Sequence, residues 1–161
     1  MSIERKYLAH YIDSAFSTNT PAYVRLGADL EEYNVELNPD VETKKNILGE
    51  NSVRIKGYEV SGEPDPYYSE YDDALSKKIL DLANERATGD ACKTTVVDAL
   101  FKEDGTCLWA YKEDAIVVPK SIGGDTLGVQ TPFTVHYAGN RVKGTFATNN
   151  NTFTASSASS D

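Results

Sequence analysis

The side chains that most often carry covalent or acid–base chemistry are scarce in this chain of 161 residues. It has two cysteines, Cys92 and Cys107, and two histidines, His10 and His136. Nucleophilic catalysis needs a serine or cysteine beside a base that a third group orients, and neither histidine lies in such a motif. No pair of these residues has the spacing of a zinc site. The sequence therefore predicts two free thiols, no metal, no cofactor and no enzymatic activity.

Carboxylates are abundant, and they suggest two further kinds of chemistry. Adjacent pairs occur at Glu31-Glu32 and Asp72-Asp73. Neighbours on a strand point to opposite faces, and acids at the start of a helix favour its dipole, so neither pair predicts acid–base catalysis. Residues 59–73 contain six acids and no base, a composition that could hold Ca²⁺. Because no calcium-loop spacing is present, we interpret this segment as a solvated acidic surface.

The charge balance limits the possible partners. Asp and Glu outnumber Lys and Arg by 25 to 16, the net charge is −9, and the bases are interspersed with acids. Stable binding to nucleic acid needs clustered Lys and Arg that displace counterions from phosphates, so the charge balance argues against a DNA-binding module. An acidic wall would, however, let DNA slide past without sticking. No apolar run approaches the roughly 20 residues of a membrane helix, so no membrane partner is expected.

The pattern of apolar residues predicts an α+β fold, mainly an antiparallel β-sandwich or barrel with one flanking α-helix. Residues 3–16 have apolar side chains at helical spacing and predict a further short amphipathic helix. Turns are expected at residues 123–125 and 139–140. The expected strands are residues 22–26, 31–37, 53–60, 93–102, 107–112, 129–137, 142–146 and 149–154. Residues 115–119 are a further apolar run that either continues the strand at 107–112 or bends off it.

The long flanking helix is predicted at residues 70–87, where an apolar stripe recurs at helical spacing. Ser69 and Asp72 fit a capping box at its start, and Gly89 fits a glycine cap at its end.

The domain organisation predicted from the sequence is simple. Residues 1–154 are expected to form a single domain. Residues 155–161 are small and polar and predict a flexible C-terminal tail.

Residues 38–51, between two expected strands, are polar, mixed in charge and without a convincing period. A connection of about a dozen residues is longer than a hairpin usually needs, and long loops in compact domains are often functional. The composition is typical of a segment that is loose alone and ordered by a partner.

Residues 33–50, YNVELNPDVETKKNILGE, resemble the signature stretch of phage major tail proteins, the tail tube subunits found in phages of Gram-positive bacteria. The resemblance extends in order over roughly residues 3–146. Its other pieces are Gly57-Tyr58, the DPYY sequence at 65–68, Arg86 with TGDA at 88–91, GGDT at 123–126 and GNR at 139–141.

The resemblance implies a structural role in a virion tail, after synthesis in the cytoplasm of a host bacterium. Subunits of this family are β-sandwich domains that form hexameric rings. The rings stack into a hollow tube around the tape measure protein, and tail terminator and tip proteins complete the tube. The phage DNA later passes through it, so the implied partners are other copies of the chain, these tail proteins and, transiently, DNA.

The resemblance also implies that residues 38–51 are an arm that contacts the adjacent ring. Its charged side chains would set the register of that contact. Ile47 and Leu48 would be apolar anchors, or alternatively would open the next strand inside their own core. The arm residues expected in the contact are Asn38, Pro39, Asp40, Glu42, Lys44, Lys45, Ile47, Leu48 and Gly49.

Two other functions remain open on the sequence alone. One is a β-sandwich binding module that recognises carbohydrate or a partner protein. Its platform would be the aromatic residues Tyr67, Tyr68, Tyr71 and Trp109. The other is the inner tube of a contractile phage tail or of a phage-like bacteriocin.

Overall fold

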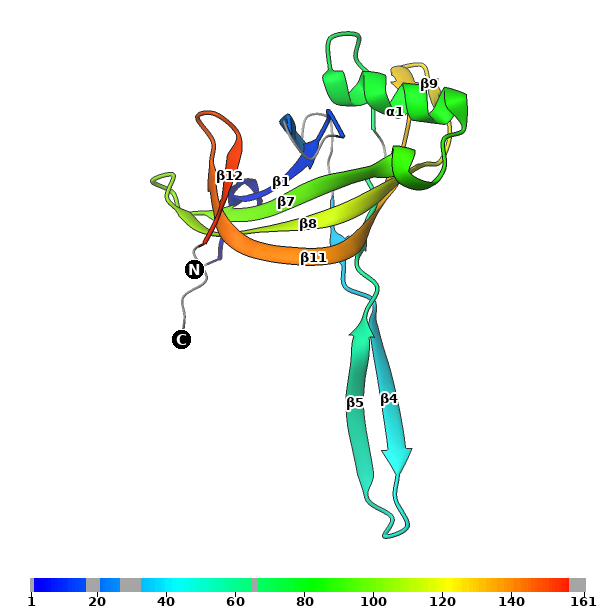
Figure 1. The fold of residues 1–161 in the computed structure, drawn as a ribbon, viewed down its shortest axis with the longest axis vertical. Helices are drawn as coiled ribbons and strands as arrows, with labels where there is room; N and C mark the ends of the chain where they lie inside the picture. The colour runs from blue at the N-terminus through cyan, green and yellow to red at the C-terminus, as the bar shows by residue number, and fades with distance from the viewer. Residues whose placement is uncertain (1, 17–20, 27–32, 65–66, 157–161) are drawn as a thin grey trace.

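The structure, a computed structural model, describes residues 2–16, 21–26, 33–64 and 67–156. Its main feature is an antiparallel sheet of order β2-β1-β7-β8-β11-β6-β3, with β12 paired to the far end of β11. The sheet curls into a half-barrel (Figure 1). The strands are β1 (Leu8–Asp13), β2 (Tyr23–Leu26), β3 (Val35–Glu36), β6 (Ser61–Gly62), β7 (Lys93–Phe101), β8 (Cys107–Pro119), β11 (Phe133–Ala147) and β12 (Thr152–Ala155). The predicted α+β fold class is confirmed.

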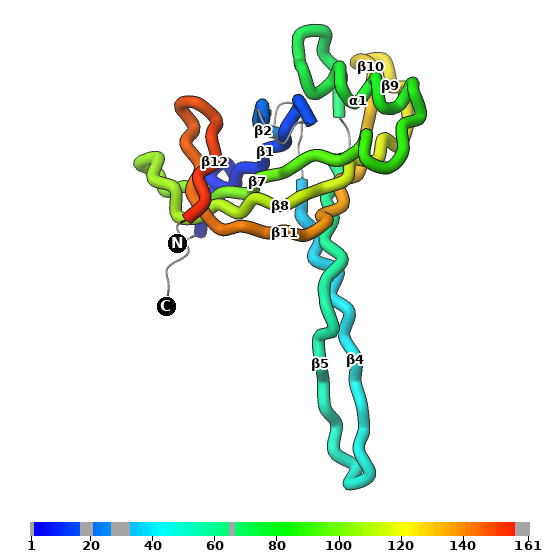
Figure 2. The backbone as a smooth tube through the Cα atoms, viewed as in Figure 1, coloured from blue at the N-terminus to red at the C-terminus, as the bar shows by residue number. Residues whose placement is uncertain are grey.

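Three smaller elements flank this sheet. The helix α1 (Ala74–Glu85) and the short hairpin of β9 (Gly123–Asp125) and β10 (Gly128–Gln130) lie at one end of the molecule (Figure 1). A second hairpin, formed by β4 (Pro39–Lys45) and β5 (Asn51–Tyr58), projects from the sheet in the opposite direction (Figure 2). Two 3₁₀ turns, η1 (Arg5–Tyr7) and η2 (Gly89–Cys92), precede β1 and β7.

The sheet has a buried cluster on each face. Successive residues of a strand point to opposite sides, and on β7 Val96 belongs to one cluster while Val97 belongs to the other. The first cluster includes Ile79 of α1, and the second includes Phe146, whose ring stacks on Tyr11 at 4.0 Å. Burial of both faces explains why residues 96–100 of β7 are apolar apart from Asp98.

The helix predicted at residues 3–16 is wrong. After the 3₁₀ turn the chain enters β1, which pairs with β2 on one side and with β7 on the other. Residues 9–13 are all buried. A central strand satisfies its backbone hydrogen bonds on both edges while it buries both faces. Tertiary pairing therefore overrides the helical spacing of the apolar residues.

The turn predicted at residues 139–140 is a bulge inside the continuous strand β11. Gly139 and Asn140 have φ of +102° and +57°, and the pairing with β8 shifts register on each side of Gly139. Left-handed backbone thus bends the strand instead of reversing the chain. Residues 115–119, expected either to continue the strand at 107–112 or to bend off it, continue it as the single strand β8. The turn predicted at 123–125 is β9. Of the strand predicted at 31–37, residues 31–32 lie outside the described residues.

The helix predicted at residues 70–87 exists but begins later, and its N-terminal capping was predicted wrongly. The side chain of Asp73 is the N-cap and accepts a hydrogen bond from the backbone N–H of Leu75 at 3.0 Å. Asp72 precedes this cap. Ser69 does not cap either, because its hydroxyl is 2.7 Å from that of Thr131. The capping-box spacing in the sequence is thus fortuitous.

The C-terminal cap differs as well. Arg86, at φ +52° and ψ +47°, is the left-handed residue that ends α1, and its N–H donates to the carbonyls of Leu82 and Ala83. Gly89 lies three residues later and begins η2. Arg86, and not Gly89, is therefore the C-cap of α1.

The predicted flexible tail, residues 155–161, falls mostly on residues 157–161, which lie outside the described residues. Ala155 ends β12, and the N–H of Ser156 donates to the carbonyl of Lys143 at 2.9 Å. The tail boundary and the single-domain boundary stay predictions.

Candidate functional site

The β4–β5 hairpin, residues 39–58, is the candidate functional element, and we call it the arm. Its strands pair antiparallel from Pro39 opposite Tyr58 to Lys45 opposite Asn51, with a bulge after Asp40. Residues 38–51, predicted as an irregular connection, thus hold the first strand and the tip of a hairpin. The strand predicted at 53–60 is its second strand.

Residues 46–50 form the tip of the arm. The side-chain oxygen of Asn46 accepts hydrogen bonds from the N–H groups of Leu48 and Glu50, both at 2.9 Å. Gly49 has φ of +83°, which glycine adopts without strain. This tight turn leaves Ile47 fully exposed and Leu48 76% exposed. Ile47 and Leu48 therefore do not open a strand inside their own core, which was one of the two alternatives predicted for these residues.

Cross-strand pairing gives the arm one apolar face. Val41 lies opposite Ile55, and Thr43 lies opposite Val53, so these side chains share one side of the hairpin. Val41, Val53 and Ile55 are each more than half exposed. No other described element covers this face, since none of the arm residues is buried.

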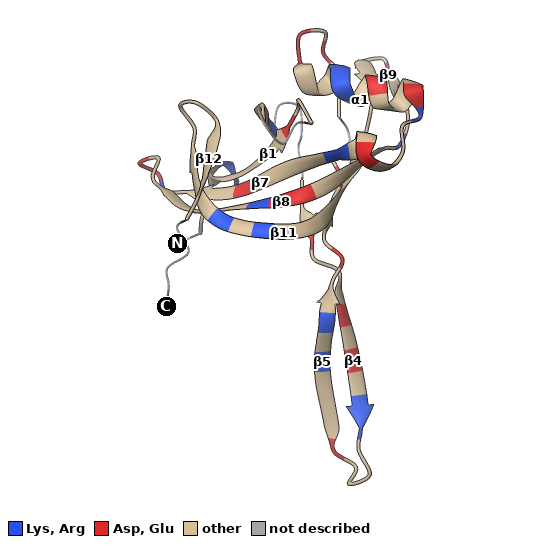
Figure 3. Cartoon of the chain, in the orientation of Figure 1, with Lys and Arg blue, Asp and Glu red and all other residues tan. Residues whose placement is uncertain are grey.

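The other face of the arm is charged. The carboxylate of Glu42 lies 3.0 Å from Arg54, 3.5 Å from Lys56 and 3.6 Å from Lys44. Exposed ion pairs of this kind contribute at most about 1 kcal/mol each, so they add little to the stability of the hairpin. The arm has four basic and three acidic residues, a net charge of +1, which leaves −10 for the rest of the chain (Figure 3).

The exposed apolar residues and free backbone edges of the arm are features of a surface that binds another protein. An isolated two-stranded hairpin is marginally stable in water, and it presents free backbone edges as well as apolar side chains. Exposed apolar patches usually mark interaction sites. The large apolar residues exposed on the arm are Val41, Ile47, Leu48, Val53, Ile55 and Tyr58.

The structure places the predicted arm residues as follows. Pro39, Asp40, Glu42, Lys44 and Lys45 lie on β4, and Ile47, Leu48 and Gly49 lie in the tip. Asn38 lies at the root, where its side-chain amide donates to the carbonyl of Glu59 at 2.9 Å. The alternation of apolar and basic residues from 53 to 56 predicts a strand, but sequence reasoning placed Val53, Ile55 and Tyr58 after the arm and not in it.

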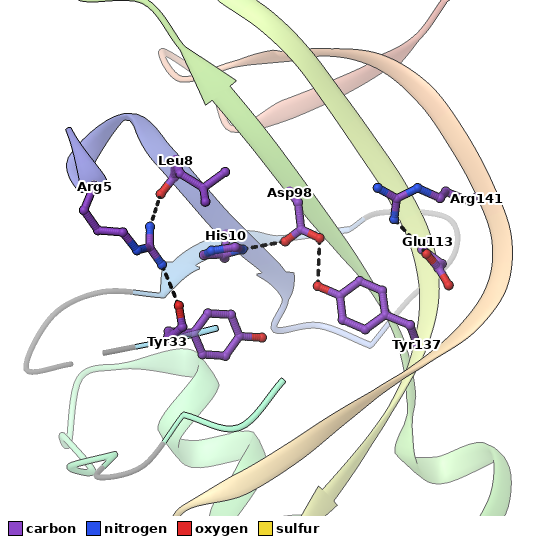
Figure 4. A network of polar contacts seen from close by, with 8 residues as sticks. All are labelled: Arg5, Leu8, His10, Tyr33, Asp98, Glu113, Tyr137 and Arg141. Carbon is purple, nitrogen blue, oxygen red and sulfur yellow. Dashed lines mark hydrogen bonds and ion pairs between the residues drawn. The ribbon is translucent and has the colours of Figure 1, made fainter. Parts of the chain in front are cut away.

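The root of the arm is held against the sheet by Tyr33. The strands β3 and β6 flank the arm and pair with each other, and β6 also pairs with β11. The Tyr33 ring lies over Gly62 of β6, and its carbonyl accepts a hydrogen bond from Arg5 at 2.9 Å (Figure 4). The segments before and after the arm, β3 and β6, are therefore held together at its root, next to the Tyr33 ring.

The substitution Gly62→Ala is expected to destabilise this root. A methyl group at residue 62 would lie 2.7 Å from Cζ of the buried Tyr33 ring, which has to move. Overpacking of this kind costs about 1–3 kcal/mol, measurable as a lower free energy of unfolding in urea. The matched control is Gly57→Ala in the arm, where the methyl group meets no atom within 4 Å. Equal free energies of unfolding for the two variants would contradict the packing of Tyr33 against Gly62.

A buried polar network extends from Tyr33 across the sheet. His10 Nδ1 and Asp98 Oδ1 are 2.6 Å apart, and the Tyr137 hydroxyl donates to Asp98 Oδ2 at 2.8 Å. The Tyr33 ring meets the His10 ring edge-on, with centroids 4.7 Å apart (Figure 4). His10 Nε2 is buried and has no hydrogen-bond partner among the described residues. The network therefore connects β1, β7 and β11 to Tyr33 at the root of the arm.

A second ion pair lies at the bulge of β11. Glu113, which is buried, accepts hydrogen bonds from Arg141 at 2.9 Å and from the N–H of Gly139 at 3.2 Å (Figure 4). The Arg141 guanidinium also lies over the Tyr111 ring, 4.3 Å from its centroid. These contacts hold the irregular backbone of the bulge in place.

Sequence reasoning gave His10 and Asp98 no role. They are 88 residues apart, and only the pairing of β1 with β7 brings them together. The signal available was Asp98 itself, a charged residue inside the apolar run VVDALF, where burial requires a partner. The His–Asp pair suits a structural role, because His10 is only 6% exposed and one ring nitrogen already contacts the carboxylate.

The other sequence candidates are distributed as follows. Cys92 and Cys107 are free thiols, as predicted. No group of three or more His, Cys, Asp or Glu side chains among the described residues could hold a metal ion. The four aromatic residues do not form one platform, since Tyr67 is buried, Tyr71 is 95% exposed and Trp109 packs beside Tyr111 on β8.

Alkaline pH is expected to destabilise the fold. Burial raises the pKa of Tyr33, Tyr67 and Tyr137 above the ordinary value of 10.0, and the Asp98 carboxylate raises that of Tyr137 further. These phenols stay neutral in the folded chain while they ionise in the unfolded chain. The free energy of unfolding is therefore unaffected below pH 10 and falls above it, by about 1.4 kcal/mol per pH unit for each tyrosine.

Urea unfolding at a series of pH values between about pH 8 and about pH 11 measures this effect. The variant Tyr137→Phe should give a shallower decline than the original chain. A free energy of unfolding that stays constant over the whole range would contradict the prediction.

Comparisons with known proteins give a likeness in fold. The sequence matches no protein-family profile and no curated protein sequence. Among solved structures, the chain is similar to the sheath/tube terminator of an extracellular contractile injection system (PVC). The TM-score is 0.52 at 9% identity, over 89% of this chain and 96% of that one. It is also similar to the tube terminating cap of the anti-feeding prophage, with a TM-score of 0.50 at 11% identity, over 90% of this chain and 92% of that one.

At such low identities the likeness concerns the fold alone. The likeness extends over most of the length of all three chains. Separately, none of the helices in the described part of the chain is long and apolar enough to cross a membrane.

Proposed function

We propose that this chain is a structural subunit of a tail-type tube, and that its arm docks on a neighbouring copy. The observation that carries the proposal is the arm itself. It projects from the body, exposes an apolar face and an apolar tip, and buries none of its own residues. Such an element is costly to leave in water and is accounted for by a surface that covers it.

The finer proposal is that of a major tube subunit in the virion tail. Hexameric rings of the chain would stack around a tape measure protein, meet terminator and tip proteins at the ends, and later let DNA pass. The likeness in fold to a sheath/tube terminator and to a tube terminating cap supports a place in such an assembly. The net charge of −9 supports passage of DNA without retention. Synthesis in the cytoplasm of a host bacterium belongs to the same proposal.

A second candidate function is that of a tube terminator. It is favoured by the two similar structures, which are a sheath/tube terminator and a tube terminating cap. A major subunit must both donate an arm and accept one, so that stacking continues. A terminator forms a ring that docks once and stops. The two functions therefore differ in how far the purified protein assembles.

Negative-stain microscopy of the purified full chain over a range of concentrations tests the proposal. Tubes that lengthen with concentration and time would support the major subunit. Closed rings of uniform height would support the terminator. Protein that stays dispersed at every concentration would contradict both functions.

A further inference from the structure

We infer that the groove beside the C-terminal end of α1 receives the arm tip of a second copy of this chain. The inference rests on the proposed function and names the surface that the arm contacts. An arm that docks in a groove at the other end of an identical subunit makes a head-to-tail contact, which repeats without limit or closes into a ring.

The groove lies between α1 and the end of β8, and its volume is about 620 Å³. Its position follows from the left-handed exit of the chain at Arg86, which turns residues 87–92 back toward the sheet. Val118 and Ile122 are 42% and 47% exposed at its mouth. The apolar residues that line it include Leu82, Ala83, Ala87, Ile116, Val118 and Ile122.

The arm tip presents apolar side chains that match the apolar lining of this groove. Ile47 and Leu48 are adjacent apolar side chains at the extreme end of a hairpin, and their own fold covers neither. The tip and α1 lie at opposite ends of the molecule (Figure 2). A subunit therefore does not fill its own groove, and the occupant has to come from another copy.

Charge favours the same pairing. Glu50 is the only charged residue of the arm tip, residues 46–50. The charged residues that line the groove are Arg86 and Lys120, both basic. Opposite charges on the two surfaces steer association and oppose wrong pairings, such as groove against groove. Assembly is accordingly expected to weaken as salt screens the attraction.

Directed cross-linking between two different variants tests the inference. One protein carries Leu48→Cys and the other carries Ile122→Cys, and both keep the two native cysteines. The variants are mixed, allowed to assemble and oxidised, and mass spectrometry of the digest maps the disulfides. The expected product links position 48 of one copy to position 122 of another. The matched control replaces Ile122→Cys by Leu108→Cys, since Leu108 is also 47% exposed but lies outside the groove.

A second measurement does not depend on disulfide formation. Ile122→Glu is expected to raise the concentration needed for assembly by about tenfold or more, and Leu108→Glu is expected to leave it unchanged. Assembly without a 48–122 disulfide, or with an equal yield of a 48–108 disulfide, would contradict docking of the arm tip in the groove. It would leave the proposed function intact. Wild-type protein that never assembles would contradict both.

Discussion

A chain in which Asn-Gly replaces residues 41–56 is expected to fold normally and to lose assembly completely. The replacement closes the pair of Asp40 and Gly57 with a two-residue turn that suits a hairpin. It removes the apolar face and the tip, so several side chains worth about 1.5–3 kcal/mol each on burial no longer reach a partner. Sedimentation and negative-stain microscopy, at concentrations where the original chain assembles, measure the loss.

The body is the internal control for this variant. None of the removed residues is buried, so the midpoint of thermal unfolding should stay within about 3 °C of the original. The matched variant Val53→Thr with Ile55→Thr keeps the hairpin and its preference for a strand but reduces the apolar face. It should assemble more weakly than the original chain. Full-length tubes from the armless chain would show that the arm is not the assembly element.

The substitution Asp98→Ala is expected to have the largest effect on stability. It leaves the Tyr137 hydroxyl and His10 Nδ1 buried without their shared acceptor. Breaking a buried pair of this kind costs about 3–5 kcal/mol, a large part of the total stability of about 5–15 kcal/mol that is usual for a domain. Urea unfolding at neutral pH measures the change.

The variant Tyr137→Phe separates the two halves of this network. It removes one hydrogen bond to Asp98 and leaves the contact with His10, so it should cost only about 0.5–1.5 kcal/mol. In the double variant with Asp98→Ala the two losses should not add, because both act on one network. A loss below about 1 kcal/mol for Asp98→Ala would mean that the network contributes little to the fold.

Much of the fold was predictable from local patterns. The strands β2 and β7, the existence of α1 and the α+β class follow from runs and periods of apolar residues, because burying one face or both requires that spacing. The candidate site was predictable in part. The sequence located the arm within residues 38–51, but it did not show that the strand after the arm belongs to it.

The remaining features depend on contacts between residues far apart in the chain. Helical spacing in residues 3–16 gives way to a strand because β2 and β7 offer hydrogen bonds on both edges. Asp98 has a partner only because β1 lies beside β7. The sequence by itself determined which segments are apolar enough to be buried and which charges accompany them. Tertiary structure decided the pairing of strands, the caps of α1 and the projection of the arm, because a backbone hydrogen bond or a buried charge is satisfied by whichever group the fold brings within about 3 Å.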